Sequence, residues 1–117
     1  MKRYWFTFTL VFLSSLCFSQ GNIQKARSFL EKGERFDQKN TYDSAATNYR
    51  KAGDIFWDLY QREESRQYLR YYLYSIGQAA YSYNKLGQYK QSNELISNAV
   101  SNTNSIIKAK NKLYGNL

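Results

Sequence analysis

The chain lacks the residues on which most catalytic and metal chemistry depends. It contains no histidine and one cysteine, so metal sites built from these residues and nucleophile-base pairs have few donors. Proline is absent and glycine occurs six times, which excludes collagen-like, proline-rich and low-complexity classes. The composition therefore predicts a noncatalytic protein that uses neither a metal nor another cofactor.

What the chain has in quantity is aromatic surface and positive charge. Of its 117 residues, 18% are aromatic, and 17 Lys or Arg residues against 9 Asp or Glu residues give a net charge of +8. A chain of this length forms one small domain, and large aromatic side chains can fill the core of a short chain. These proportions favour a folded domain whose function is contact with another molecule.

The first 19 residues have the layout of a signal peptide. Lys2 and Arg3 supply a basic start, and residues 4–18 form an uncharged, mostly apolar run. Cys17 and Ser19 are small residues at the third and first positions before a cut that would precede Gln20. We therefore expect a signal peptide at residues 1–19, export through the Sec pathway, and a periplasmic or extracellular location in a bacterium.

Two other interpretations of this segment stay open. The apolar run could be retained as an N-terminal anchor, although it is shorter than the about 20 apolar residues of a membrane-spanning helix. Cys17 could carry a lipid, but Ser14, Ser15 and bulky Leu16 precede it in an order unlike that of lipoprotein signals. With cleavage after Ser19, the mature chain would keep no cysteine for a disulfide and no membrane span.

Apolar residues after Asn22 recur at helical spacing in four successive stripes. No segment alternates apolar and polar residues between hairpin turns, so a sheet is not expected. A polar break at residues 37–41, a polar segment at 61–67 and the pair Leu86 and Gly87 separate the stripes, and glycine suits a helix end. The pattern predicts an all-α fold of antiparallel helical hairpins, with helices over residues 23–36, 42–60, 69–86 and 89–113.

Two segments of the chain, residues 40–52 and 87–99, align without gaps. Each contains a turn, then a tyrosine, a small residue, a large residue and an alanine. This pattern resembles the second helix of a tetratricopeptide repeat (TPR), and the preceding helices carry matching residues. The resemblance implies that residues 20–117 form a short TPR-like α-solenoid, as the N-terminal part of a longer array. The matching residues are Phe29, Gly33 and Phe36 in the first copy and Ile76, Ala80 and Tyr83 in the second.

The spacing of the two copies departs from the TPR pattern. Tyr42 and Tyr89 lie 47 positions apart, whereas the family repeats at intervals of about 34 residues. The extra residues would lengthen two adjoining helices by about two turns each. Long-helix repeats of this kind are similar to the arrays that precede the caspase-like CHAT domain in bacterial exported proteins, and to those of kinesin light chain.

The resemblance also implies where a partner would bind. In TPR proteins the first helix of each repeat lines a concave groove for extended or helical peptides. The groove expected here is mixed in charge and does not reproduce the family's lysine-asparagine clamp for C-terminal carboxylates. For its two tyrosines, packing against a neighbouring repeat is the simpler explanation. The residues expected to face this groove include Arg27, Glu34, Tyr74, Tyr81, Asn84 and Lys85.

Three functions are compatible with these patterns. The first is an exported, noncatalytic scaffold that binds another protein, a peptide or a copy of itself. The alternative is the sensing arm of a larger CHAT-type protease or signalling protein whose catalytic domain lies outside this segment. The third is a nucleic-acid-binding module, because Arg62, Arg66 and Arg70 recur every four residues near several tyrosines. Glu63 and Glu64 interrupt this ridge, so we interpret it as a solvated helix face and expect no nucleic-acid ligand.

The last predicted helix keeps an apolar edge that one preceding helix cannot readily cover. Ile96, Val100, Ile106 and Ile107 lie along it, and a terminal repeat needs a polar outer face to stay soluble. We therefore expect the isolated mature segment either to self-associate through residues 99–107 or to be only marginally stable.

Overall fold

The chain is an all-α protein, as the helical stripes predict. In this computed structural model, the backbone is described for residues 2–115 and the side chains for residues 20–113 and 115, so the predicted signal peptide falls outside the described side chains. Residues 2–115 contain no strand. The four helices are α1 (Lys2–Gln38), α2 (Tyr42–Glu63), α3 (Arg66–Lys85) and α4 (Tyr89–Gly115).

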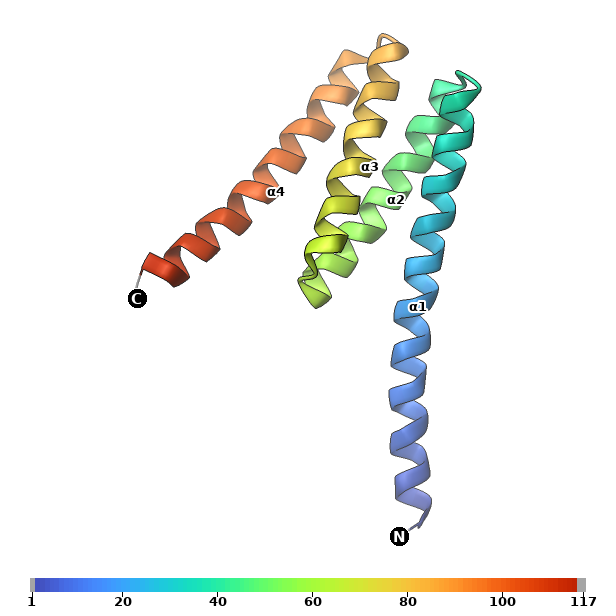
Figure 1. Ribbon diagram of the computed structural model, residues 1–117, viewed down its shortest axis with the longest axis vertical. Helices are drawn as coiled ribbons and strands as arrows, with labels where there is room; N and C mark the ends of the chain where they lie inside the picture. The colour runs from blue at the N-terminus through green and yellow to red at the C-terminus, as the bar shows by residue number, and fades with distance from the viewer. Residues whose placement is uncertain (1, 116–117) are drawn as a thin grey trace.

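Successive helices run in opposite directions and pack against their neighbours (Figure 1). The helix α2 packs against both α1 and α3, and α4 packs against α3. From its start beside the end of α3, α4 diverges from α3 and α2 toward the C-terminus. The architecture is therefore a stack of antiparallel helical hairpins in which α4 has packed neighbours along only part of its length.

Two of the three turns have the same backbone construction. Asn40 after α1 and Gly87 after α3 both have a positive φ, 58° and 75°. In each turn the next residue donates its N–H to a carbonyl five residues earlier, Thr41 to Phe36 and Gln88 to Tyr83, both at 2.9 Å. These bonds satisfy carbonyls at the helix ends, and the left-handed position favours Gly or Asn. The two turns lie 47 positions apart, so the repeat seen in the sequence is also present in the backbone.

The turn between α2 and α3 differs from its prediction. The polar segment 61–67 was expected to separate two helices, but α2 continues to Glu63 and α3 begins at Arg66. Glu64 adopts a φ of 53° and donates its N–H to the carbonyl of Tyr60 at 2.7 Å. Residues 61–63 are exposed, and an exposed helical turn can be entirely polar. Apolar periodicity therefore gave no sign that the helix continues through these residues.

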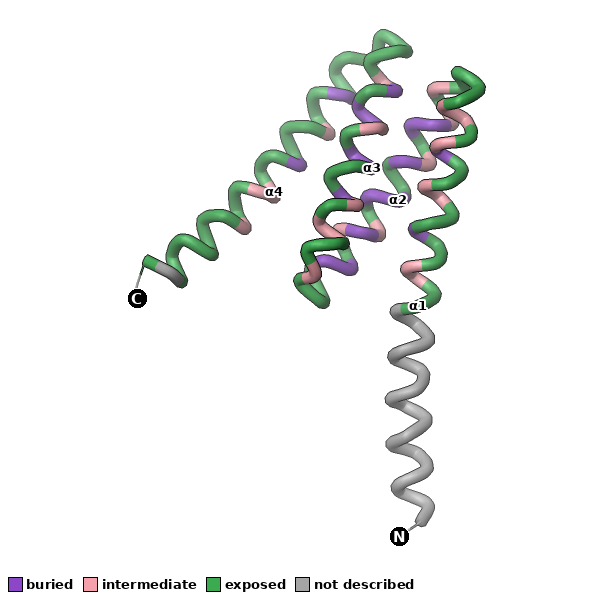
Figure 2. Tube along the Cα trace, viewed as in Figure 1, coloured by how far each residue is buried: buried purple, intermediate pink, exposed green. Residues whose placement is uncertain are grey.

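The core is built from small residues as well as aromatic ones. Figure 2 shows where the buried positions lie along the helices. Because alanine has a single methyl group, it lets neighbouring helix backbones approach closely. The largest fully buried apolar side chains, Tyr49, Phe56 and Leu59, all belong to α2, the helix between α1 and α3. The alanines that are buried are Ala26, Ala45, Ala46, Ala52, Ala79, Ala80 and Ala99.

Two glycines mark the closest approaches between helices. A Cβ atom added at Gly33 on α1 would lie 2.8 Å from the Tyr49 ring of α2, and one at Gly53 on α2 would lie 2.6 Å from Cδ1 of Ile76 on α3. Both distances are shorter than van der Waals contact between carbon atoms. Glycine at position 33 therefore leaves room for the Tyr49 ring, and glycine at position 53 leaves room for the Ile76 side chain.

An aromatic cluster joins α2 to the first turns of α3. The rings of Phe56 and Tyr71 stack with centroids 5.0 Å apart, and those of Trp57 and Tyr72 lie 4.9 Å apart. Aromatic pairs at such distances add about 0.5–1.5 kcal/mol beyond the burial of their area. The cluster holds α3 against α2 beside the turn at residues 64 and 65 that connects these two helices.

Candidate functional site

The helices α1 and α3 lie close enough for their side chains to meet. The hydroxyl of Tyr74 on α3 donates a hydrogen bond to Oε1 of Glu34 on α1 at 3.4 Å. These are two of the residues predicted to line a groove, and they are 40 positions apart in the chain. We call the surface formed by Arg27, Glu34, Tyr74, Tyr81 and Lys85 the α1–α3 face.

A buried tyrosine lies beneath this contact. Tyr49 of α2 is 1% exposed, and its hydroxyl lies near enough to Asp37 of α1 for that carboxylate to influence its ionisation. Burial raises the pKa of Tyr49 far above its ordinary value, and the nearby Asp37, Tyr74 and Glu34 raise it further. The phenol therefore stays neutral below the α1–α3 face.

At the start of α3, the face carries charges of both signs. Glu63 of α2 and Arg27 of α1 both lie near enough to Tyr68 on α3 to influence its ionisation. Burial is the main reason that the pKa of Tyr68 is raised; Glu63 raises it further, and the positive charge of Arg27 lowers it. Arg27 is exposed and available to a ligand at this end.

Near the end of α3, the face is aromatic and basic. The Nζ atom of Lys85 lies 5.4 Å from the ring centroid of Tyr81, within the range of a cation-π interaction. Both side chains are exposed, as is Asn84, whose carbonyl accepts the N–H of Gly87 at 3.0 Å. The predicted groove residues thus occur in three places along the face: Arg27 near Tyr68, Glu34 with Tyr74, and Tyr81 with Lys85.

Sequence reasoning did not place Tyr49 and Tyr68 at this face. Tyr49 lies within the predicted helix 42–60, but spacing along a helix does not reveal which groups of another helix lie near its hydroxyl. The signal that could have pointed to it is Gly33, because a missing side chain on one helix leaves room for a ring from the next.

The predicted arginine ridge is interrupted by a turn. Arg62 lies on α2, whereas Arg66 and Arg70 lie on α3, because the helix breaks at residues 64 and 65. Arg62 also forms an ion pair with Asp58 one helical turn earlier, at 3.4 Å. A continuous i, i+4 ridge of three arginines, as sequence spacing suggested, is therefore wrong.

A second surface lies between α3 and α4. A hollow of about 430 Å³ opens there, lined mainly by apolar side chains that include Leu73, Ile96 and Val100. All three are exposed, so the apolar edge expected on the last helix is present. Of the four residues predicted for that edge, Ile106 is half-buried and the others are exposed.

Searches of the described residues for metal sites and membrane spans give no candidate. In that part of the chain, no three His, Cys, Asp or Glu side chains come together as a metal site would require. None of the described helices combines the length and hydropathy that crossing a bilayer demands. Comparison of the whole chain with family models, with curated proteins and with solved structures gives no match.

Proposed function

We propose that the chain is a noncatalytic, TPR-like scaffold that binds a protein or peptide across its α1–α3 face. The observation that carries this proposal is the exposure of Tyr74 and Tyr81, seven residues apart on one helix and flanked by Glu34 and Lys85. Tyrosine is enriched among the residues that contribute most to protein interfaces. Charges of both signs beside the rings suit a peptide that offers apolar side chains together with acidic and basic groups.

The rigidity of the face supports the same proposal. The helices α1 and α3 both pack on α2, and Gly33 and Gly53 keep these contacts close. A binding surface on packed helices loses little conformational entropy when a ligand binds. The paired turns at Asn40 and Gly87 agree with a repeat architecture, in which one face of successive hairpins serves as a binding surface.

We also propose that the scaffold acts outside the cytoplasm. This part of the proposal rests on the sequence of residues 1–19, with its basic start and apolar run. The absence of cysteine after residue 17 is compatible with an oxidising compartment.

Site-specific photo-crosslinking in the native cells tests the proposed binding. With p-benzoylphenylalanine in place of Tyr81, irradiation is expected to give a discrete adduct with one protein, because this ring is exposed on the α1–α3 face. The matched control places the same photo-reactive residue at Thr47, an exposed position on α2. We expect the adduct to be absent at position 47 and to be lost from position 81 when Tyr74→Ala is added. No adduct, or the same adducts from both positions, would contradict the proposal.

A further inference from the structure

The surface of the first hairpin on which α3 packs has an equivalent on the second hairpin. That equivalent surface is uncovered. In the first hairpin, Ala26, Tyr49 and Gly53 are buried. Gly53 is in direct contact with α3, where Ile76 and Ser75 lie nearest to it. This surface is therefore covered by the helix that follows the hairpin.

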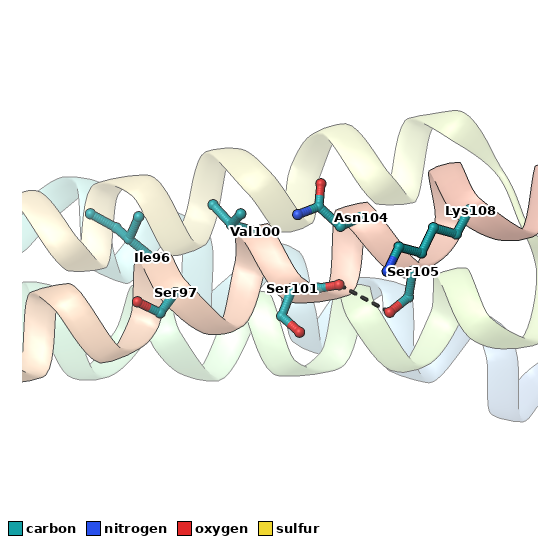
Figure 3. A pocket seen from close by; sticks show the side chains of 7 residues that line it. All are labelled: Ile96, Ser97, Val100, Ser101, Asn104, Ser105 and Lys108. Atoms are coloured by element: carbon teal, nitrogen blue, oxygen red, sulfur yellow. Dashed lines mark hydrogen bonds between the residues drawn. The ribbon is translucent and has the colours of Figure 1, made fainter. Parts of the chain in front are cut away.

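The residues 47 positions later are exposed. Leu73, Ile96 and Val100 take the places of Ala26, Tyr49 and Gly53, and Ile96 and Val100 are 45% and 52% exposed. Figure 3 shows Ile96, Val100 and Asn104 following one another along α4. We call the surface formed by Leu73, Ile96, Val100, Thr103 and Ile107 the open face; the hollow between α3 and α4 lies on it.

We propose that the open face binds an amphipathic helix of a partner protein, antiparallel to α4 as α3 is to α2. The occupant of the equivalent surface is α3, which places Ile76 and the small residues Ser75 and Ala79 against the first hairpin. The partner helix therefore has small and apolar residues on the part that meets Ile96 and Val100. This surface is separate from the α1–α3 face, and the inference does not depend on the function proposed for that face.

Around Thr103, the open face is more polar than the equivalent part of the first hairpin. Phe56 and Trp57, whose rings contact tyrosines of α3, are replaced 47 positions later by Thr103 and Asn104. Hydroxyl and amide groups at these positions can donate and accept hydrogen bonds. The first turns of the partner helix therefore carry polar side chains where α3 carries Tyr71 and Tyr72.

The positive charge near the end of α4 indicates which residues the N-terminus of the partner helix carries. In the first hairpin, Glu63 at the end of α2 lies near Tyr68 at the start of α3. The residue 47 positions after Glu63 is Lys110, which is exposed, as are Lys108 and Lys112. An acidic residue at the position of Tyr68 would lie near Lys110, and acidic residues also stabilise the first turn of a helix. The partner helix is therefore acidic at its N-terminus.

A second copy of this chain matches the open face poorly. The helices α3 and α4 have no acidic residue in their first turns, and α2 lies between α1 and α3. On α1, the positions equivalent to Tyr72 and Ala79 are Lys25 and Lys32, both exposed. Docking of α1 from another copy would place these two lysines against the open face, so a different protein is a better occupant than a second copy.

A labelled peptide tests the proposal directly. The probe has the sequence of residues 65–86 with Tyr68→Glu, Tyr71→Gln and Tyr72→Gln, and its binding to the full chain is followed by fluorescence anisotropy. We expect saturable binding that Val100→Glu weakens by about tenfold or more, because the new carboxylate would be buried against an apolar helix. The control is Asn98→Glu, which adds the same charge two residues earlier, about 200° around the helix, and should change the affinity less than about twofold.

Two further measurements separate this proposal from its rivals. A Tyr68→Lys peptide is expected to bind about fivefold more weakly than the Tyr68→Glu peptide, and Lys110→Gln should reduce this difference. Tyr74→Ala, which alters the α1–α3 face, should leave peptide binding unchanged. Absence of binding, or equal weakening by Val100→Glu and Asn98→Glu, would overturn the proposal. So would a dimer, seen by sedimentation, that Val100→Glu dissociates and the peptide does not.

Discussion

Replacing Phe56 by alanine is expected to lower the free energy of unfolding by about 3–5 kcal/mol. The Phe56 side chain is 1% exposed and its ring stacks on Tyr71 of α3, so the substitution removes both a buried ring and an aromatic pair. Because small domains are stable by only about 5–15 kcal/mol, this loss is a large share of the total. Urea unfolding of the full chain, followed by circular dichroism at the helical band, measures it.

The control for Phe56→Ala is the removal of a ring that is not packed. Tyr89 at the start of α4 is 63% exposed, and Tyr89→Ala is expected to change the free energy of unfolding by less than about 0.5 kcal/mol. Equal losses for the two variants would show that Phe56 is not in the core.

Replacing Gly33 by alanine is expected to cost about 1–3 kcal/mol of stability, although alanine is the better helix former. The added methyl group would lie 2.8 Å from Cδ1 of Tyr49, whose side chain is only 1% exposed and packed on every side. The ring therefore cannot move aside, and α1 must shift away from α2. Thermal and urea unfolding of the full-length variant both report the change.

A second glycine supplies the opposite expectation. Gly77 lies in the middle of α3, and a Cβ atom there would have no neighbour within 4 Å. Gly77→Ala is therefore expected to raise the free energy of unfolding by about 0.5–1 kcal/mol through helix propensity alone. Stabilisation by both substitutions would refute the close approach of α1 and α2 at Gly33.

The local structure of the chain follows closely from its sequence. Apolar spacing predicted four helices. Gly87 was correctly expected at the end of the third helix, where the backbone adopts the left-handed conformation that glycine favours. The alignment of Tyr42 with Tyr89 also anticipated the equivalence of the turns at Asn40 and Gly87. These features depend on residues a few positions apart, where periodicity and turn chemistry are informative.

Features that depend on packing between helices were less predictable. The sequence placed Glu34 and Tyr74 on the same groove only through a resemblance, since no local rule relates residues 40 positions apart. The divergence of α4 has no local signal either, because it depends on how α4 packs against α3. The half-buried position of Ile106 follows from the same packing and was not foreseen.

Native-state hydrogen exchange of the full chain tests the central claim, that α3 covers the first hairpin while the equivalent surface of the second is open. Amides of Tyr49, Gly53 and Phe56 are expected to exchange at least about tenfold more slowly than those at the equivalent positions Ile96, Val100 and Thr103, because local opening of α4 breaks fewer buried contacts. Equal protection at the paired positions, or slower exchange in α4, would contradict the account.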